Sequence, residues 1–276
     1  MVRHSVLSRS IVQLEDRVGV ALFKRSRGGV TPTLAGRTVL RIARLILEQV
    51  DTLLESGRHS GRGEVGRLSI GFCTSISAGN LRATLAEFKH RHPRIEIATV
   101  ERSRMRLATA LRNGTADVLI VTGEVPLPDN NVRSLWSERI LVSLPEDHVL
   151  AASPVVYWTD LRSETVLLSQ YDPGRELEDL LISHLSSPTD RPKIERHDVS
   201  RGIIKSLISM KLGISLVLES DIGASFAGLV YRELRGGNGP TRVGFSAHWR
   251  ADNENPALNN FITLLAERYP SPISRE

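Results

Sequence analysis

Cysteine and long apolar runs are nearly absent from this sequence. Its single cysteine, Cys73, cannot form a disulfide within the chain, which fits a reducing cytoplasm. No stretch approaches the roughly 20 consecutive apolar residues that span a bilayer, so we expect no membrane insertion. Residues 1–10 are polar and basic and lack the apolar core of a signal peptide, so we expect no secretion. The sequence therefore predicts a cytoplasmic protein, and its hydrophobic fraction of 41% is that of a chain with a packed core.

Motifs that carry catalytic chemistry are also missing. The eight histidines are scattered, and no Cys–His or His–Glu spacing recurs that would form a metal site. No Gly-x-Ser-x-Gly elbow and no phosphate-binding loop are present. Because the usual redox switch needs a second cysteine to resolve the oxidised sulfur, we expect Cys73 to act as a small apolar residue beside a pocket. We therefore predict a protein that is not an enzyme and that binds neither a metal nor a cofactor.

Positive charge is concentrated in the first quarter of the chain. Residues 1–67 hold twelve Lys and Arg against six Asp and Glu, whereas the remaining residues hold twenty-four against twenty-five. A net charge of +6 in so short a segment favours a polyanion as partner, since each phosphate contact releases condensed counterions. A solvated basic helix face would give the same charge count, so charge alone leaves both interpretations open.

This basic segment begins with the pattern of a helix and a hairpin. In residues 5–19 apolar side chains recur at helical spacing, and Gly19 stands where a helix C-cap belongs. Residues 20–37 contain the apolar anchors Leu22 and Phe23, then a Gly-Gly turn and a short extended return. That order predicts a hairpin with basic residues around its tip.

A long helix is predicted from Ala35 to about Gly57. Its apolar stripe has the 4, 3, 4, 3 spacing of a coiled-coil seam and consists of Val39, Ala43, Ile46, Val50 and Leu53. A single helix cannot cover so wide an apolar face, so a second copy of the chain is the expected partner. Packing of the stripe against the C-terminal part of the same chain is the alternative. The Gly-, Ser- and Arg-rich residues 56–65 predict a flexible linker, which favours self-association.

Beyond the linker, strand patterns alternate with helix patterns. Strands are predicted at 68–72, 95–100, 117–123, 140–144, 165–169, 213–218, 229–234 and 242–247. Helices are predicted near 80–91, 104–113, 176–185, 203–211 and 257–268. The nearly continuous apolar run of 117–123 is typical of a buried parallel strand. The alternation predicts an α/β protein with doubly wound sheets.

The string LSRSIVQLEDRVGVALFKRSRGGVTPTLAG resembles the second half of the winged helix-turn-helix of LysR-type transcriptional regulators. The family pattern joins a Ser-Arg-x-Ile-x-x-Leu-Glu recognition helix to a Gly, a Leu-Phe-x-Arg wing, a basic Gly turn and Thr-x-x-Gly. The chain supplies these positions in order as Ser8, Arg9, Ile11, Leu14, Glu15, Gly19, Leu22, Phe23, Arg25, Arg27, Gly29, Thr33 and Gly36. RLSIGF, HPRIEI, ALRNGTADVLIV and KLGISLVLES resemble effector-domain landmarks of the same family, so the resemblance covers nearly the whole chain.

The resemblance implies a three-part organisation. Residues 1–36 would be a partial winged helix-turn-helix, because two further helices normally precede the recognition helix in the family. Residues 37–62 would be a dimerising linker helix and hinge. Residues 63–276 would be an effector-binding domain with two α/β lobes like those of a periplasmic binding protein. Lobe I would comprise about 66–138 and 241–276, and lobe II about 139–240.

The resemblance also implies which residues meet DNA. A helix in the major groove presents polar side chains to base edges, while arginines fix the register on phosphates. The residues expected to face the groove are His4, Ser5 and Ser8. Arg9 would contact backbone or bases, and Arg25 and Arg27 would lie on the wing against phosphate or the minor groove. The alternative for each of them is an ordinary surface position.

For the effector, the resemblance implies a site between the lobes, where the carboxyl ends of strands meet. The hydroxyls of Thr74, Ser75 and Ser77, with free N–H groups at the following helix start, suit an anionic group such as a carboxylate. Thr122 and Gly123 end the third strand on the same rim. From the second lobe, Ser169 and Gln170 end a strand, and Ser200 and Arg201 open a helix. The alternative for Ser75 and Ser77 is a simple helix-capping role.

The sequence thus predicts a DNA-binding regulator whose promoter activity is controlled by a small-molecule effector. Its expected partners are double-stranded DNA, the effector and further copies of the chain in a homodimer or homotetramer. An organic acid is one candidate effector, and aromatic ligands and amino acids stay open. One alternative is a truncated sensor that dimerises but does not bind DNA on its own. Another is a cytoplasmic solute-binding protein, which would leave the basic hairpin and the long helix unexplained.

Overall fold

The chain forms two units, Met1–Arg58 and His59–Glu276. The structure is a computed structural model and describes residues 4–26, 29–59, 65–123, 125, 130–171, 173–185 and 191–270. No helix in these ranges is long and apolar enough to cross a membrane. The three predicted domains and the two predicted lobe boundaries are not tested by this division and stay predictions.

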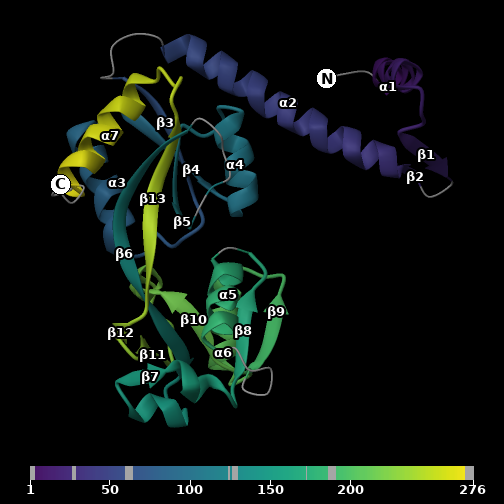
Figure 1. The fold of residues 1–276 in the computed structure, drawn as a ribbon. Helices are drawn as coiled ribbons and strands as arrows, with labels where there is room; N and C mark the ends of the chain where they lie inside the picture. Colours follow the sequence, from purple (N-terminus) through teal and green to yellow (C-terminus); the bar gives the residue numbers. More distant parts are fainter. Residues whose placement is uncertain are drawn as a thin grey trace. The chain divides into compact units, whose positions relative to one another are not determined.

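The N-terminal unit consists of two helices joined by a two-stranded hairpin (Figure 1). Its elements are α1 (His4–Val18), β1 (Phe23–Ser26), β2 (Gly29–Pro32) and α2 (Leu34–His59). The predicted helix, hairpin and long helix are confirmed, with ends that differ by one or two residues. α1 ends at the expected glycine: the Gly19 N–H donates to the Glu15 carbonyl at 2.8 Å, and Gly19 has a φ of +77°. Glycine adopts that conformation without a steric penalty.

Three residues position the hairpin relative to the helices on either side. The Glu15 carboxylate accepts the backbone N–H groups of Leu22 and Phe23 at 2.7 and 2.9 Å. The Thr33 hydroxyl accepts the Gly36 N–H at 2.9 Å, as an N-cap of α2 does. A Cβ at Gly36 would lie 1.9 Å from the Leu22 carbonyl oxygen, so only glycine permits this approach. Glu15, Thr33 and Gly36, which match the family pattern, therefore hold the hairpin against the helices.

The C-terminal unit contains every strand and helix that the pattern predicts there. Its strands are β3 (Gly66–Phe72), β4 (Ile95–Glu101), β5 (Val118–Thr122), β6 (Asn130–Pro145), β7 (Val155–Tyr157), β8 (Thr165–Ser169), β9 (Lys193–His197), β10 (Ser215–Leu218), β11 (Leu229–Gly236), β12 (Gly239–Pro240) and β13 (Arg242–Arg250). Its α-helices are α3 (Gly79–Arg91), α4 (Arg104–Arg112), α5 (Gly174–His184), α6 (Arg201–Ser209) and α7 (Pro256–Arg268), and its 3-10 turns are η1 (Val149–Ala152), η2 (Trp158–Leu161) and η4 (Glu219–Gly223). The pattern does not predict β7, β9 and β12, which are short or rich in polar residues.

Lobe I is a three-layer arrangement around the parallel strands β3, β4 and β5 (Figure 1). Along β5, Val118 and Ile120 belong to the core under α3 and α7, whereas Leu119 and Val121 belong to the core under α4. Successive side chains of a strand point to opposite faces, so covering both faces buries all five residues of β5. The continuous apolar run in the sequence has this origin.

Two long antiparallel strands, β6 and β13, join lobe I to lobe II (Figure 1). β6 pairs with β13 from Asn130 to Arg139, and from Ile140 onward it pairs with β10 and β11. The sequence predicts only 140–144 of this strand, and that estimate is too short. The missed half is polar at most positions because its side chains are largely half-buried or exposed, so it lacks the apolar signal of its other end.

Lobe II comprises β7 to β12 with α5 and α6. Here β8 and β9 are parallel partners, and β10 packs beside β8. The predicted helix 203–211 is placed two residues late: α6 runs from Arg201 to Ser209. It begins directly after Ser200 and stops before Lys211, whose φ of +62° lies outside the helical region. A φ of this sign ends a helix, as it commonly does at a C-cap.

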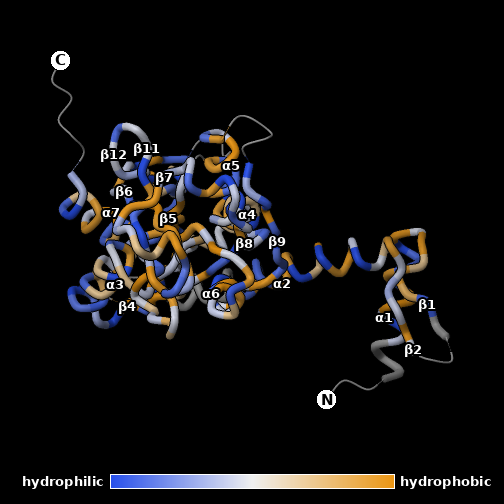
Figure 2. Tube along the Cα trace, turned by 90° about the horizontal axis from the view of Figure 1, so that it is seen from below, coloured by the Kyte–Doolittle hydropathy of each residue, from blue (hydrophilic) through white to orange (hydrophobic). Residues whose placement is uncertain are grey.

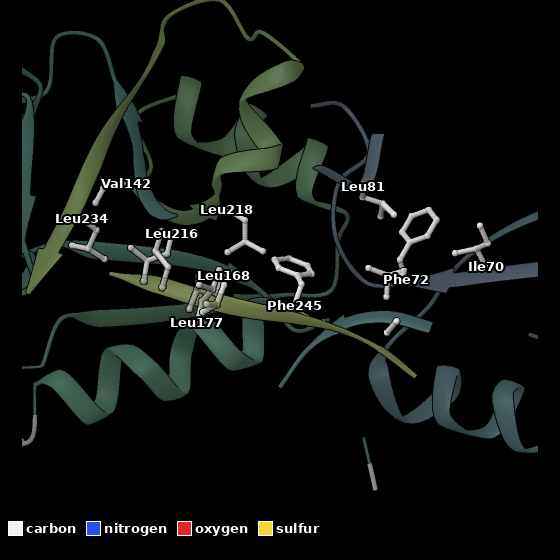
Figure 3. Packing of buried hydrophobic residues seen from close by; sticks show 14 of the residues in the cluster. Ile70, Phe72, Leu81, Val142, Leu168, Leu177, Leu216, Leu218, Leu234 and Phe245 are labelled. Atoms are coloured by element: carbon white, nitrogen blue, oxygen red, sulfur yellow. The ribbon is translucent and has the colours of Figure 1, made fainter. Parts of the chain in front are cut away.

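One apolar core runs through both lobes along the joining strands. Figure 3 shows its members in their spatial order, from Leu234 and Leu216 in lobe II, past Phe245 on β13, to Phe72 and Ile70 in lobe I. Apolar residues concentrate along inner strands such as β5, whereas α2 alternates between polar and apolar stretches (Figure 2). Burial of this continuous core is the main stabilising contribution to the C-terminal unit.

Candidate functional site

The loop after β3 lies against η4, which follows β10 of lobe II. Thr74 is buried, and its hydroxyl lies 3.3 Å from the Ser220 hydroxyl. The Ser77 hydroxyl donates to the Ser220 carbonyl at 2.8 Å. Ser75 lies 2.8 Å from the Ser77 hydroxyl and accepts the Ser77 N–H at 3.1 Å. Neither serine occupies the N-cap position of α3, which is Ala78 and makes no side-chain capping bond. Ser220 therefore links the Thr74 hydroxyl to the hydroxyls of Ser75 and Ser77.

The end of β5 reaches across to α5 of lobe II. Thr122 is buried, and its hydroxyl donates to the Glu176 carboxylate in the first turn of α5. The Thr122 carbonyl accepts from Arg104 Nη1 at 3.1 Å. Gly123 has a φ of +65°, and a Cβ there would lie 2.3 Å from Arg104 Nη1. The left-handed backbone favours glycine at this rim position, since the flexible Arg104 side chain could move away from a Cβ.

On the lobe II side the four predicted residues behave differently. The Ser169 hydroxyl donates to the Val199 carbonyl at 2.9 Å, so it ties β8 to the start of α6. Gln170 is exposed and donates its backbone N–H to the His197 carbonyl at 3.0 Å. Ser200 is the exposed N-cap residue of α6 and makes no side-chain capping bond.

Arg201 is the lobe II residue that reaches lobe I. Its Nη2 donates to the Glu101 carboxylate at 2.7 Å, and its Nη1 donates to the Cys73 carbonyl at 3.5 Å. Its Nε lies 4.0 Å from Asp221 Oδ1. Cys73 itself is 2% exposed and packs in the core under α4. Thr74, Ser77, Thr122 and Arg201 thus contact the opposite lobe. Within the described residues, the side chains of Gln170 and Ser200 form no hydrogen bond or ion pair with that lobe.

Several polar residues of this region are not predicted from the sequence. Glu138 on β6 is 3% exposed and accepts from Trp136 Nε1 and from the Ser220 N–H, both at 3.1 Å. Burial raises the pKa of the Glu138 carboxyl, against the lowering effect of those hydrogen bonds. Lys205 and Asp221 are also buried beside Arg201. No motif marks these residues, because their proximity depends on how the joining strands and α6 pack.

An open groove of about 900 Å³ runs along the joining strands beside α5. Its floor includes Trp136 and Phe245, whose rings stack with centroids 5.3 Å apart. Gly123 is at its lobe I edge, and Glu176 and Asp179 of α5 form its lobe II edge. The groove is large enough for a small organic molecule, with an apolar floor and polar edges.

The predicted DNA-contact residues fall on α1 and the hairpin. Ser8 and Arg9 are exposed on α1, where both side chains face solvent. His4 and Ser5 belong to the first turn of α1, and Arg25 belongs to β1. Arg27 lies outside the described residues. The exposed position of Arg9 leaves its guanidinium accessible to a polyanion.

The predicted dimer face of α2 is largely exposed within the N-terminal unit. Ile46 is 57% exposed and Val50 is 45% exposed, while Val39 and Ala43 are half-buried. Leu53 belongs to the helix. Ile42 and Leu47 beside the stripe are also exposed, at 47% and 62%. A stripe of large apolar side chains on one helix face is a surface that association would bury.

Comparisons with known families cover both units. Residues 1–37 match the family model described as "Bacterial regulatory helix-turn-helix protein, lysR family", and residues 61–270 match the "LysR substrate binding domain". A helix-turn-helix segment followed by a substrate-binding domain defines a ligand-sensing class of transcriptional regulator. The chain belongs to the LysR family of transcriptional regulators.

The chain matches known transcriptional regulators over most of their length. The transcriptional regulator AlsR of Bacillus subtilis is 27% identical over 262 residues, covering 94% of this chain and 85% of AlsR. HcaR of Escherichia coli, an activator of the hca operon, is 28% identical over 267 residues, covering 96% and 88%. These matches give no support to a solute-binding protein or to a truncated sensor that dimerises but does not bind DNA on its own.

Solved structures share the fold. CbnR, a LysR family transcriptional regulator, superimposes with a TM-score of 0.79 at 20% identity, covering 98% of this chain and 91% of CbnR. A full-length variant of OxyR from Pseudomonas aeruginosa has a TM-score of 0.64 at 22% identity, covering 97% and 90%. At these identities the likeness establishes the fold alone, which confirms the predicted α/β class with two lobes like those of a periplasmic binding protein.

Proposed function

We propose that this regulator binds promoter DNA through α1 and the hairpin, and that a small effector held between its lobes controls the outcome. The observation that carries the proposal is the pair of family matches, at residues 1–37 and 61–270 of one chain. CbnR, which shares the fold, has also been solved in complex with its target DNA. A basic N-terminal quarter with a net charge of +6 has the electrostatics for a phosphate backbone.

On the DNA side, α1 serves as the recognition helix and the hairpin as the wing. Ser8, with His4 and Ser5, reads base edges, and Arg9 contacts phosphate or bases. Arg25 and Arg27 contact the backbone or the minor groove beside the helix. Glu15 supports these contacts because its two hydrogen bonds fix the start of β1 relative to α1.

On the effector side, the site is formed where the two lobes touch. Its lobe I wall carries Thr74, Ser75, Ser77, Thr122 and Gly123. Its lobe II wall carries Ser169, Gln170, Ser200 and Arg201. Because Thr122 already bonds to Glu176 and Ser77 to the Ser220 carbonyl, an effector that bridges the walls exchanges or reinforces these bonds.

The occupant proposed for the apolar stripe of α2 is a second copy of the chain. Val39, Ala43, Ile46, Val50 and Leu53 repeat at coiled-coil spacing, so the same stripe on two helices is self-complementary. A dimer would present two copies of α1 to two DNA half-sites. Effector binding then changes promoter output by favouring one arrangement of the copies over another, which requires tighter binding to that arrangement.

The proposal is tested by footprinting the full chain on the DNA upstream of its own gene. Protection of two half-sites about one helical turn apart, or a multiple of that spacing, is expected from a dimer. A screen of organic acids, aromatic compounds and amino acids should then yield at least one compound that changes the footprint. Protection without any sequence preference, at all salt concentrations tried, would contradict the proposal.

A further inference from the structure

A small chamber inside lobe II contains a buried lysine. It lies between β8, β10, α5 and α6, and its volume of about 20 Å³ admits one water-sized group. Most of its lining is apolar, and its polar members are Ser169, Arg201, Lys205, Ser215 and Asp221. Arg201 also bonds to Glu101 and to the Cys73 carbonyl of lobe I, so the chamber adjoins the contact between the lobes.

Lys205 has fewer partners than a buried ammonium needs. It is 5% exposed, and its Nζ donates to the Asp221 carbonyl at 2.6 Å. The Phe226 and Tyr231 rings lie 5.7 and 5.8 Å from Nζ. In the described part of the chain, no carboxylate forms an ion pair with Nζ. An ammonium has three donors, and burying it without a counter-charge is costly.

Of the two cations that line the chamber, Arg201 is ion-paired with Glu101 and lies near Asp221, whereas Lys205 forms no ion pair in the described residues. Asp221, the one carboxylate in the lining, also accepts the Leu218 N–H at 3.3 Å. Burial lowers the pKa of Lys205, and the nearby Arg201 lowers it further against the raising effect of Asp221. In addition, α5 and α6 both begin at the chamber, and neither has a side-chain N-cap. Helix N-termini without a cap favour an anion.

We propose that this chamber is the acid-recognition subsite of the effector site and takes a carboxylate group, with Lys205 as its counter-charge. The chamber has room for one carboxylate oxygen next to Nζ, and the rest of the ligand extends past Arg201 toward lobe I. The Ser215 hydroxyl is a further donor, since its own contact to the Leu216 carbonyl is long at 3.4 Å. The inference rests on the proposed function, because it places the acid group of an effector that binds between the lobes.

The first test compares acetate with acetamide, which has the same shape without the charge. Isothermal titration calorimetry is run on the full chain at a constant ionic strength held with sodium HEPES, whose sulfonate is too bulky for the chamber. Acetate should bind and acetamide should not. Lys205→Met should weaken acetate binding about tenfold or more, as expected for a charge-assisted hydrogen bond. Lys193→Met removes a lysine with 71% side-chain exposure from the same lobe and should change nothing.

Three results would overturn the proposal: no acetate binding, equal binding of acetamide, or equal acetate binding by Lys205→Met. Should Lys205→Met fail to fold by circular dichroism, crystals of the unaltered chain soaked in sodium bromide decide the question. An anomalous peak beside Lys205 Nζ supports the subsite, and bromide found only elsewhere counts against it. Neither the calorimetry samples nor the crystals contain DNA. The subsite can therefore fail while footprinting still supports the regulator, and Lys205-dependent acetate binding can persist if footprinting fails.

Discussion

Backbone strain at a single residue can be measured by substituting that residue, and Lys211 is the clearest case. It has a φ of +62° directly after α6, and its N–H donates to the Ile208 carbonyl at 2.8 Å. The left-handed conformation strains any residue with a Cβ, so Lys211→Gly should raise the free energy of unfolding by about 1 kcal/mol. Urea unfolding measures the change. Lys211→Ala loses the same surface contact to Asp147 but keeps the strain, so equal stability of the two variants would contradict this prediction.

Glu138 should make stability depend on pH. Burial raises the pKa of its carboxyl, so the folded protein keeps this proton to a higher pH than the unfolded chain does. Stability contributed by the protonated acid is present below the unfolded pKa of about 4.3 and is lost as pH rises through the higher folded value. Glu138→Gln cannot ionise, so its Tm should improve relative to the unaltered protein as the pH rises from the unfolded pKa through the raised folded pKa of Glu138. A Tm difference that stays constant over that range would refute the assignment.

Among the elements, the N-terminal hairpin depends on α1 through one carboxylate. Glu15→Ala removes the acceptor of the Leu22 and Phe23 N–H groups and should cost about 1–3 kcal/mol of local stability. Hydrogen exchange of these two amides should accelerate. Asp16→Ala alters the exposed neighbour and should leave both amides protected. Unchanged exchange in Glu15→Ala would mean that the hairpin is held by other contacts.

The sequence predicts most elements because their apolar periodicity reflects burial on one or two faces. β5 is the strongest case, since both of its faces are covered and all five of its residues are buried. Half of β6 escapes prediction because it is polar where it joins the lobes. The candidate site divides in the same way. Strand-end loops such as 73–77 can be found from the order of elements, whereas Lys205 and Glu138 cannot, because their burial arises from packing between distant segments.

For the whole molecule, contacts between the lobes of the C-terminal unit should set how readily they separate. The Thr122 hydroxyl links β5 to Glu176 of α5. Thr122→Val keeps the shape and removes the donor, so the lobes should sample a wider range of separations. Single-molecule energy transfer between dyes on the two lobes measures that distribution. Thr109→Val removes a hydroxyl that donates to the Met105 carbonyl within α4, and it should leave the distribution unchanged. The same distribution in both variants would argue against a link through Thr122.

The central claim, that this chain reads DNA through α1 and the hairpin, is tested most directly by fluorescence anisotropy on its own upstream DNA at two salt concentrations. The unaltered chain is compared with a variant that carries Ala at positions 9, 25 and 27. A control variant carries Ala in place of three exposed arginines of the other unit, Arg82, Arg106 and Arg175. The account predicts sequence-preferring binding by the unaltered and control chains, and a salt slope smaller by about 3 in the triple variant, one for each lost phosphate contact. Equal affinity and equal salt slope in all three proteins would contradict it.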